Sequence, residues 1–314
     1  MKKQIKKIVL FLLILVAVLF GMSISDDFSF NQVAAEFENN ELLQINFLDV
    51  GQGDSIYIRL PDDRDILIDG GPNKNVLSQL GQVMPFWDRD IDIMILTHPH
   101  SDHVAGLVEV LKRFNVKQIY YTGVLHTTSD YIAWLEEIRN QEIPLEIVKQ
   151  PFDLEFTSDI KLEFLYPLTD LTNQKVEDLN NTSIVNRLVY NDFEIMLTGD
   201  AEAEVEEELI RLCHTEVQDD EGGEPRDGML CELHSDILKL GHHGSTSSSS
   251  DEFLEIVDPE AVIVQVGNEN PFGHPHLRTI KKIERSNLPI YRNDQDGLIK
   301  IITDGSKYEV FTKE

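Results

Sequence analysis

The sequence THPHSDH, at residues 97–103, holds three histidines and one aspartate within six residues. It follows an apolar segment and precedes a segment with helical spacing, which predicts a loop at the carboxyl end of a strand. Because side chains alternate along an extended chain, His98 and His100 would point to the same side. The turn into the helix would bring Asp102 and His103 from another direction. Imidazole and carboxylate groups in this pattern indicate a site for one divalent ion or a pair of them.

Further candidate side chains lie on predicted turns and loops elsewhere in the chain. Asp200 lies in LTGDAE, the pair His242 and His243 in GHHGS, and His274 in GHPH. Three aspartates, Asp49 and Asp54 in FLDVGQGDS and Asp69 in ILIDGG, occupy turns near the amino-terminal end of the pattern.

The periodicity of apolar residues predicts alternating strands and helices from residue 43 onward. Strands are predicted at 43–50, 55–60, 65–68, 91–96, 117–121, 145–148, 161–165, 183–190, 193–197, 236–240, 261–266, and near 289–292, 297–302 and 307–312. Helices are predicted at 75–87, 103–114, 130–140, 201–212, 250–257 and 277–285. Groups of strands separated by helices favour a layered α/β sandwich.

These motifs together resemble a known family. The pattern H-x-H-x-D-H after a strand is similar to the signature of the metallo-β-lactamase superfamily. With FLDVGQGDS, ILIDGG, LTGDAE, GHHGS and GHPH, the chain resembles the extracellular hydrolase domain of ComEC competence proteins over about residues 43–312. The resemblance implies a metallo-β-lactamase-like αββα sandwich, of the α/β class, with a metal site at one edge.

The resemblance also implies roles for individual residues. The expected ligands of two divalent ions, zinc or manganese, are His98 and His100 for the first, Asp102 and His103 for the second, and Asp200 between them. Either His242 or His243 would complete the second site, and His242 is preferred because it comes first after the strand. Asp102 and His274 are the expected catalytic residues, His274 as an acid or a phosphate contact.

Residues around the ligands are expected to orient them. A carboxylate that accepts the second N–H of a ligand histidine would hold its tautomer, and Asp69 is preferred over Asp49 and Asp54 for this role. Many relatives supply a third histidine to the first ion where this chain has Asn181 and its neighbours. An amide or hydroxyl ligand there weakens the site for zinc and favours harder ions such as manganese.

The charge of the chain restricts its substrates. With 27 Lys and Arg against 56 Asp and Glu, the net charge of −29 argues against holding duplex nucleic acid on a basic face. Two divalent ions would nevertheless create a local positive site, suited to a phosphodiester. Thiolester and β-lactam hydrolysis remain alternatives on the same fold.

The amino terminus predicts export. Four lysines precede an apolar run at residues 8–20, which is typical of a secretory signal but is short for a membrane anchor. Both readings place the rest of the chain outside the cytoplasm. We therefore expect a signal peptide or membrane anchor at 1–25, a linker at 26–42 and a hydrolase domain at 43–314, with membrane contact only through the amino-terminal segment and no protein partner.

The two cysteines lie at the two ends of an acidic, glycine-rich insert. A disulfide between Cys213 and Cys231 is the favoured interpretation for an exported protein. A small zinc site with His214 and His234, or two unpaired thiols, are the alternatives.

These observations favour an exported two-metal phosphodiesterase or nuclease, with DNA as one candidate substrate. One alternative is a surface enzyme similar to phosphorylcholine esterases, which acts on cell-wall or lipid phosphodiesters. The other is a non-catalytic surface-binding module that has kept the fold.

Overall fold

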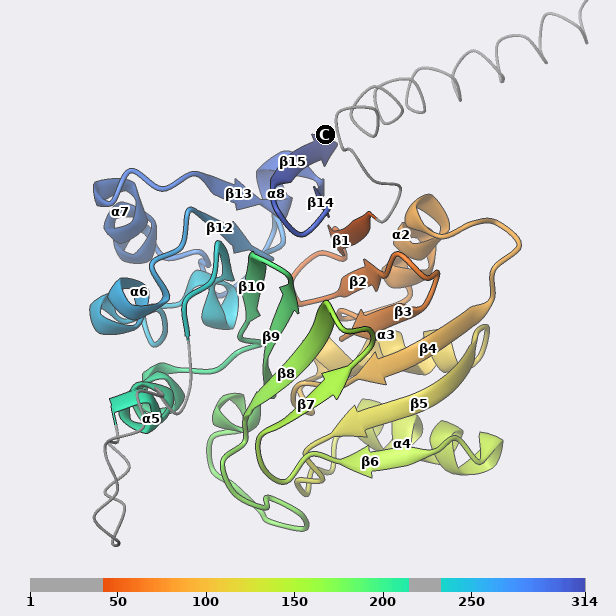
Figure 1. Cartoon of the computed structure of the whole chain (residues 1–314). Coiled ribbons are helices and arrows are strands. Elements are labelled where there is room, and N and C mark those ends of the chain that lie inside the picture. The colour runs from red at the N-terminus through yellow and green to blue at the C-terminus, as the bar shows by residue number, and fades with distance from the viewer. Residues whose placement is uncertain (1–41, 215–232, 314) are drawn as a thin grey trace, which may run out of the picture. The chain divides into compact units, whose positions relative to one another are not determined.

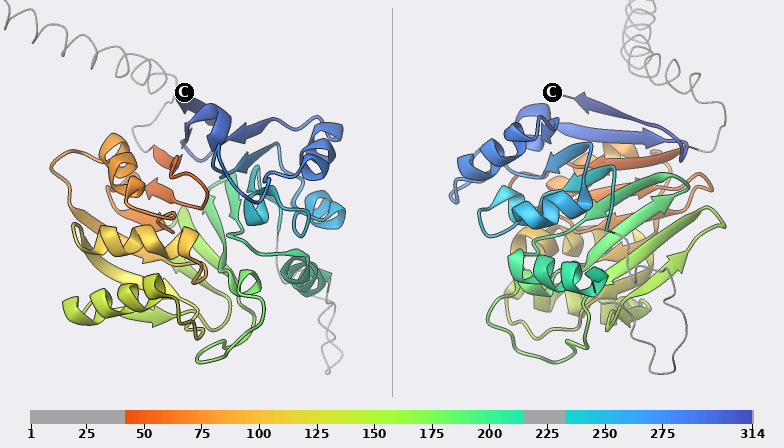
Figure 2. Two further views of the ribbon diagram at one scale, coloured as in Figure 1. Left: turned by 180° about the vertical axis from the view of Figure 1, so that it is seen from behind. Right: turned by 60° about the vertical axis from the view of Figure 1, so that its left-hand side comes forward.

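Two β-sheets lie face to face in the computed structural model, which describes residues 42–214 and 233–313. Helices between residues 75 and 141 cover the outer face of one sheet, and helices between residues 203 and 285 cover the outer face of the other (Figure 1). The views in Figure 2 show the same four layers from behind and from the side. The α/β sandwich expected from the sequence is thus confirmed.

The first sheet has eight strands in the order β15-β14-β1-β2-β3-β4-β5-β6. Its strands are β1 Leu43–Phe47, β2 Ile56–Arg59, β3 Asp65–Ile68, β4 Asp90–Ile95, β5 Asn115–Tyr121, β6 Leu145–Ile147, β14 Leu298–Thr303 and β15 Tyr308–Lys313. The second sheet has seven strands in the order β13-β12-β11-β10-β9-β8-β7. Its strands are β7 Phe152–Glu155, β8 Ile160–Tyr166, β9 Val185–Tyr190, β10 Phe193–Leu197, β11 Ile237–Lys239, β12 Ala261–Val264 and β13 Ile290–Arg292.

The helices follow the expected order. They are α2 Asn75–Val83, α3 Ser101–Leu111, α4 Ser129–Gln141, α5 Ala203–His214, α6 Asp251–Val257, α7 Leu277–Arg285 and α8 Asn293–Asp296, with short 3₁₀ helices at Asn180–Thr182 and Gly241–Gly244. Helix α2 ends four residues before the predicted end, because Pro85 cannot continue a helix. The sequence does not predict strand β7, which has only four residues and lies at the edge of its sheet.

Alternation along the strands builds the core. In β2, Ile56 and Ile58 face the second sheet, while Tyr57 between them packs under the helices of the first sheet. Both faces of the central strands are therefore buried, which explains their nearly continuous apolar sequences.

Parallel pairing decides where the loops meet. Strands β3, β4 and β5 are parallel, as are β10, β11 and β12. Loops that follow parallel strands lie at the same edge of a sheet, and polar residues gather there. The loops after β3, β4, β10 and β11 carry Asp69, residues 98–103, Asp200 and the pair His242 and His243. Other candidates follow β1 and β12 or precede β9.

The amino-terminal prediction falls outside the described residues, as do residues 26–41 of the expected linker and Cys231. Residues Leu43–Glu314 group into one compact unit. In the two described stretches, no helix has the length and apolar character needed to cross a bilayer.

Candidate metal centre

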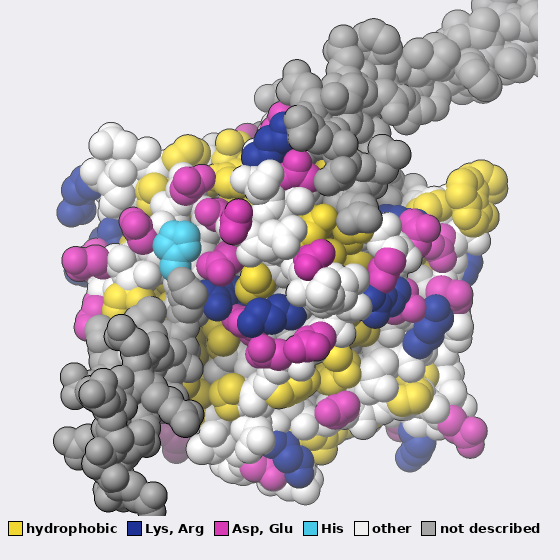
Figure 3. Space-filling view, in the orientation of Figure 1, with side chains coloured by type: hydrophobic (Ala, Val, Ile, Leu, Met, Phe, Trp, Pro, Cys, Tyr) yellow, Lys and Arg dark blue, Asp and Glu magenta, His cyan; other side chains and the backbone are white. Residues whose placement is uncertain are grey.

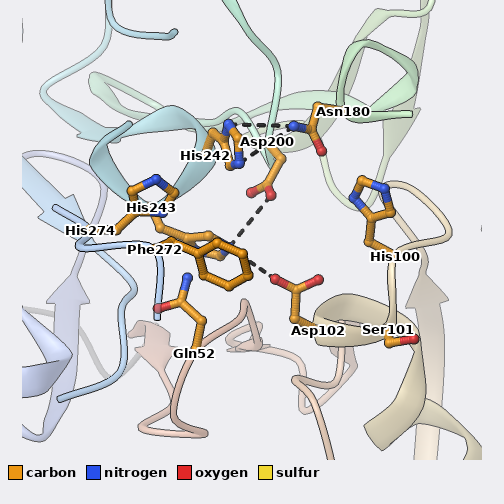
Figure 4. Close-up of a pocket in the computed structure, with 10 residues that line it drawn as sticks. All are labelled: Gln52, His100, Ser101, Asp102, Asn180, Asp200, His242, His243, Phe272 and His274. Atoms are coloured by element: carbon orange, nitrogen blue, oxygen red, sulfur yellow. Dashed lines mark hydrogen bonds and ion pairs between the residues drawn. The ribbon is translucent and has the colours of Figure 1, made fainter. Parts of the chain in front are cut away.

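A cavity of about 300 Å³ lies where these loops meet (Figure 4). Its lining residues are Gln52, His100, Ser101, Asp102, Asn180, Asp200, His242, His243, Phe272 and His274. Half of the twelve histidines, aspartates and asparagines singled out in the sequence line this cavity, although they lie up to about 170 positions apart.

Asp200 lies at the centre of the cluster. Its Oδ2 atom is 3.3 Å from His103 Nε2 and 3.5 Å from His243 Nε2. Asp102 Oδ2 is 3.4 Å from the same His243 atom. One ligand atom from each of these four residues lies within 4.8 Å of all the others. This is the spacing of side chains that share one ion.

His98 and His100 form the second part of the cluster. His98 Nε2 lies 3.0 Å from His100 Nδ1 and 3.9 Å from Asp200 Oδ2. Figure 4 shows Asp200 between His100 on one side and His243 on the other. Asp200 is thus the one carboxylate shared by both groups of histidines.

Asp69 fixes the orientation of His103, in the position that the sequence analysis preferred. Its Oδ2 atom lies 2.7 Å from His103 Nδ1 and accepts a hydrogen bond from Thr97 Oγ1. Gly106 permits this contact, since a Cβ there would lie 1.7 Å from the Gly70 carbonyl oxygen and would push helix α3 away. The carboxylate leaves His103 Nε2 free to face Asp200.

Asp54 and the backbone fix His243 in a similar way. His243 Nδ1 lies 2.9 Å from the Gln265 carbonyl oxygen and 3.3 Å from Asp54 Oδ1. Both histidines that face Asp200 therefore have their second nitrogen held by buried oxygen atoms.

Lys239 is a site residue that the sequence analysis missed. Its side chain is fully buried, forms an ion pair with Asp54 and donates a hydrogen bond to the Gly199 carbonyl oxygen at 2.8 Å. A lysine in the apolar strand sequence ILKL was the available signal, because a buried charge requires a partner.

The charges of the cluster change the proton affinity of the histidines. Burial lowers the pKa of His103 and of His243, but the neighbouring carboxylates, Asp200 above all, outweigh it. The pKa of His103 lies well above its usual value, and that of His243 rises to about 10. In His98 burial prevails and lowers the pKa well below its usual value. The half of the cluster around Asp200, Asp102 and His243 thus attracts positive charge.

The structure brings His243 into the cluster, rather than the preferred His242. Both residues adopt left-handed backbone angles, with φ of 46° and 54°, and their rings diverge. His242 Nδ1 lies 2.8 Å from Glu202 Oε1 and 3.2 Å from Ser247 Oγ. It lines the cavity without facing Asp200.

Asn181 also lies apart from the cavity. Its Oδ1 atom accepts a hydrogen bond from the Glu202 backbone N–H, whereas the neighbouring Asn180 lines the cavity. Ser183 approaches the first pair of histidines instead, with its Oγ atom 3.3 Å from His98 Nδ1. Asp49 is half-buried and is not among the lining residues.

His274 does line the cavity, opposite His100. Burial and the neighbouring histidines lower its pKa to about 4. Its Nδ1 atom is buried and has no hydrogen-bond partner among the described residues.

The expected disulfide involves a residue outside the described part of the chain. Cys213 lies near the end of α5 and is not a free thiol. Its predicted partner Cys231 is not described.

The residues of the cluster fit a divalent ion. His103 Nε2, His243 Nε2 and Asp200 Oδ1 are buried and form no hydrogen bond within residues 42–214 and 233–313. Buried polar atoms are costly unless they have a partner. Imidazole nitrogens and carboxylate oxygens that converge without protein partners are suited to metal coordination.

Comparisons with known proteins agree with this geometry. Residues 48–267 match the model of the metallo-beta-lactamase superfamily. The chain is 28% identical to ComE operon protein 3 of Bacillus subtilis and 27% identical to competence protein ComA of Neisseria gonorrhoeae, over 82% and 80% of its length. It spans only about a third of either relative, 32% and 31%.

Solved structures show weaker likeness. Igni18, a metallo hydrolase of Ignicoccus hospitalis, has a TM-score of 0.48 at 12% identity, covering 86% of this chain and 100% of that one. At this score the likeness supports no functional assignment. The superfamily match, the ComEC-like relatives and the His/Asp cluster together show that this chain belongs to the metallo-β-lactamase superfamily, as a metal-dependent hydrolase.

Proposed function

We propose that this hydrolase is a phosphodiesterase that uses two divalent ions and acts outside the cytoplasm. His98 and His100 would hold the first ion, and Asp102, His103 and His243 the second. Asp200 would contribute to both, because it lies between the two groups (Figure 4).

The charge of the cluster is the observation that carries the proposal. Four carboxylates, those of Asp54, Asp69, Asp102 and Asp200, meet a single lysine, Lys239. Histidines that bind a metal are neutral, so the metal-bound cluster would have three excess negative charges of its own, which two divalent ions would convert to a single positive charge. A phosphodiester, which carries one negative charge, matches that site.

The bound ions and the protein side chains would have different roles in the reaction. When bound, divalent ions lower the pKa of a water molecule and offset the negative charge of the phosphate. The protein holds the ligand rings in place through Asp69 and Asp54. His274, kept neutral at pH 7 by burial, would contact the substrate from the opposite wall of the cavity.

We expect manganese to serve the first site better than zinc. The amide of Asn180 lines the cavity together with His100, and the His126 ring lies 6.3 Å from the His100 ring. Oxygen ligands favour harder ions.

The substrate is either a nucleic acid or a smaller phosphodiester. The name of one relative, competence protein ComA, favours DNA. The acidity of the chain favours a smaller substrate such as a phosphorylcholine ester, because a nucleic acid would need a basic surface. On the face shown in Figure 3, the Lys and Arg side chains lie among Asp and Glu side chains.

One assay series tests the proposal. Purified protein is stripped with chelator, reloaded with Mn²⁺ or Zn²⁺, and given bis(p-nitrophenyl) phosphate, single-stranded DNA, p-nitrophenyl phosphorylcholine, nitrocefin and a thiolester. We expect phosphodiester cleavage, faster with Mn²⁺, and DNA cleaved in preference to the choline ester. Turnover of nitrocefin or the thiolester with every phosphodiester intact would contradict the proposal.

The proposed location has its own test. The basic and apolar amino-terminal segment supports export, and external protease should therefore digest the protein on intact cells. A protease-protected cytosolic pool as the main species would contradict it.

A further inference from the structure

We infer that Phe272 and Gln52 form a binding subsite for one planar base of the substrate, beside the metal centre. This inference rests on the proposed phosphodiesterase function. It names the chemical group of the substrate that the protein would bind next to the phosphate.

Phe272 is an exposed aromatic ring at the edge of the metal cavity. It is 61% exposed, although it lines the same cavity as Asp102 and Asp200. Figure 4 shows the ring between Gln52 and Asp102. Such exposure of a large apolar side chain is unfavourable in the free protein, and a flat ligand that stacked on the ring would relieve it.

The loop that carries Phe272 is braced by hydrogen bonds of Asn270. Asn270 Nδ2 donates hydrogen bonds to the carbonyl oxygens of Gly267 and His274, at 2.9 and 2.8 Å. Asn270 Oδ1 accepts one from the His274 backbone N–H at 2.9 Å. The Phe272 and His274 rings lie 5.8 Å apart with their planes at 25°. Binding would therefore not have to order this loop, and its cost in entropy would be small.

Gln52 adds a hydrogen-bond donor beside the ring. Its Oε1 atom accepts a hydrogen bond from the Gly267 backbone N–H at 3.3 Å, which fixes the direction of the amide. Its Nε2 atom is buried and has no partner among the described residues. Unpaired amide donors are costly when buried, so this one is available to an oxygen of the bound base.

The lining favours a base over a quaternary ammonium group. Phe272 is the only Phe, Tyr or Trp among the ten described residues that line the cavity. Choline-like groups are bound in cages of several aromatic rings. A nucleobase needs only one ring face for stacking.

The test measures binding without turnover. A dinucleoside phosphorothioate with two 2-aminopurine bases is titrated into Mn²⁺-loaded protein, and its fluorescence quenching reports stacking. An abasic phosphorothioate is measured by competition. We expect Phe272→Ala to weaken binding of the base-bearing probe by about 5- to 100-fold, the equivalent of 1–3 kcal/mol. Binding of the abasic probe should change less than twofold.

Three further variants sharpen the result. Phe272→Trp should restore both affinity and quenching, and Gln52→Ala should weaken only the base-bearing probe. Phe86→Ala is the matched control, because Phe86 is 81% exposed and lies outside the lining of this cavity; it should bind both probes as the wild type does.

The possible failures are distinguishable. Equal binding of the two probes by wild-type protein, or equal behaviour of the Phe272→Ala and Phe86→Ala variants, would overturn the subsite alone. A larger loss of affinity for phosphorylcholine than for the base-bearing probe in Phe272→Ala would also overturn it. A wild type that quenches 2-aminopurine but cleaves no phosphodiester would support the subsite and overturn the proposed function.

Discussion

The Lys239 ammonium group and the Asp54 carboxylate form an ion pair in which the two side chains are only 0% and 1% exposed. The pair joins strand β11 to the loop between β1 and β2, close to His243 Nδ1. Because water cannot solvate either group, each charge depends on the other. The position of the Asp54 carboxylate beside His243 therefore depends on Lys239, whose other hydrogen bonds go to the Gly199 and Leu240 carbonyl oxygens.

Replacement of Lys239 by methionine should destabilise the protein strongly. The change leaves Asp54 buried without its counter-charge, and loss of one partner of a buried pair costs about 3–5 kcal/mol. Urea unfolding of chelator-treated protein measures this loss. The double variant with Asp54→Asn should recover part of it. The control is Lys112→Met, which breaks an exposed pair with Glu109 and should cost under about 1 kcal/mol. Equal losses of stability in the Lys239 and Lys112 variants would contradict the importance of the buried pair.

The neighbouring histidines should differ in metal retention. His243 faces Asp102 and Asp200, so His243→Ala should lose the ion of the second site after dialysis. His242 faces Glu202, so His242→Ala should keep the wild-type metal content. Elemental analysis of the dialysed variants distinguishes the two. Loss of metal in the His242 variant alone would restore the preference drawn from the sequence.

Removal of the central carboxylate should abolish activity. Asp200→Asn eliminates the charge shared by both histidine groups, and we expect kcat/KM to fall at least ~10³-fold. Asp102→Asn should have a similar effect through the second site alone. Initial rates with the best phosphodiester measure both. Asp251→Asn, with its side chain 88% exposed on α6, is the control and should stay within twofold of wild type.

Asp65 should make stability depend on pH. Burial raises the pKa of Asp65 to about 6, although Tyr57 and the Asp92 backbone donate hydrogen bonds to it. The folded state therefore holds this proton more tightly than the unfolded chain. The resulting stability is complete below about pH 4 and is lost as the pH rises to about 6, by at most about 3 kcal/mol.

The variant Asp65→Asn isolates this effect. Urea unfolding of chelator-treated protein from pH 4 to 7 should give a flatter stability profile for the variant than for wild type. Asp153→Asn, at an exposed position on β7, should follow the wild-type profile. Parallel profiles for wild type and Asp65→Asn would show that Asp65 does not hold the proton.

Local sequence patterns predicted much of the architecture and part of the cluster. Apolar periodicity located most of the strands and helices, because burial of both sheet faces leaves its pattern along the chain. Spacing alone predicted His98 and His100 on one side of an extended stretch and Asp102 and His103 at the turn into the following helix, which begins at Ser101 rather than at residue 103. These are local relationships, set by the strand period and the helix turn.

Tertiary structure decided which residues meet across the sheets. Adjacent His242 and His243 are equivalent in sequence, and their left-handed backbone angles send one ring to Glu202 and the other to Asp200. In the same way, the 3₁₀ turn at Asn180–Thr182 sends Asn180 to the cavity and Asn181 away from it. Periodicity does not encode the direction of such turns, because packing against distant loops sets it.

Lys239 and Phe272 are two further residues whose contacts local sequence patterns do not predict. Sequence alone shows a charge in an apolar strand and an aromatic residue near a glycine. Only the packing of β11 against the β1–β2 loop supplies Asp54 as the partner of Lys239. Only the convergence of loops from both sheets places Phe272 at the edge of the metal cavity. Long-range contacts of this kind depend on how the sheets stack, which no local pattern in the chain specifies.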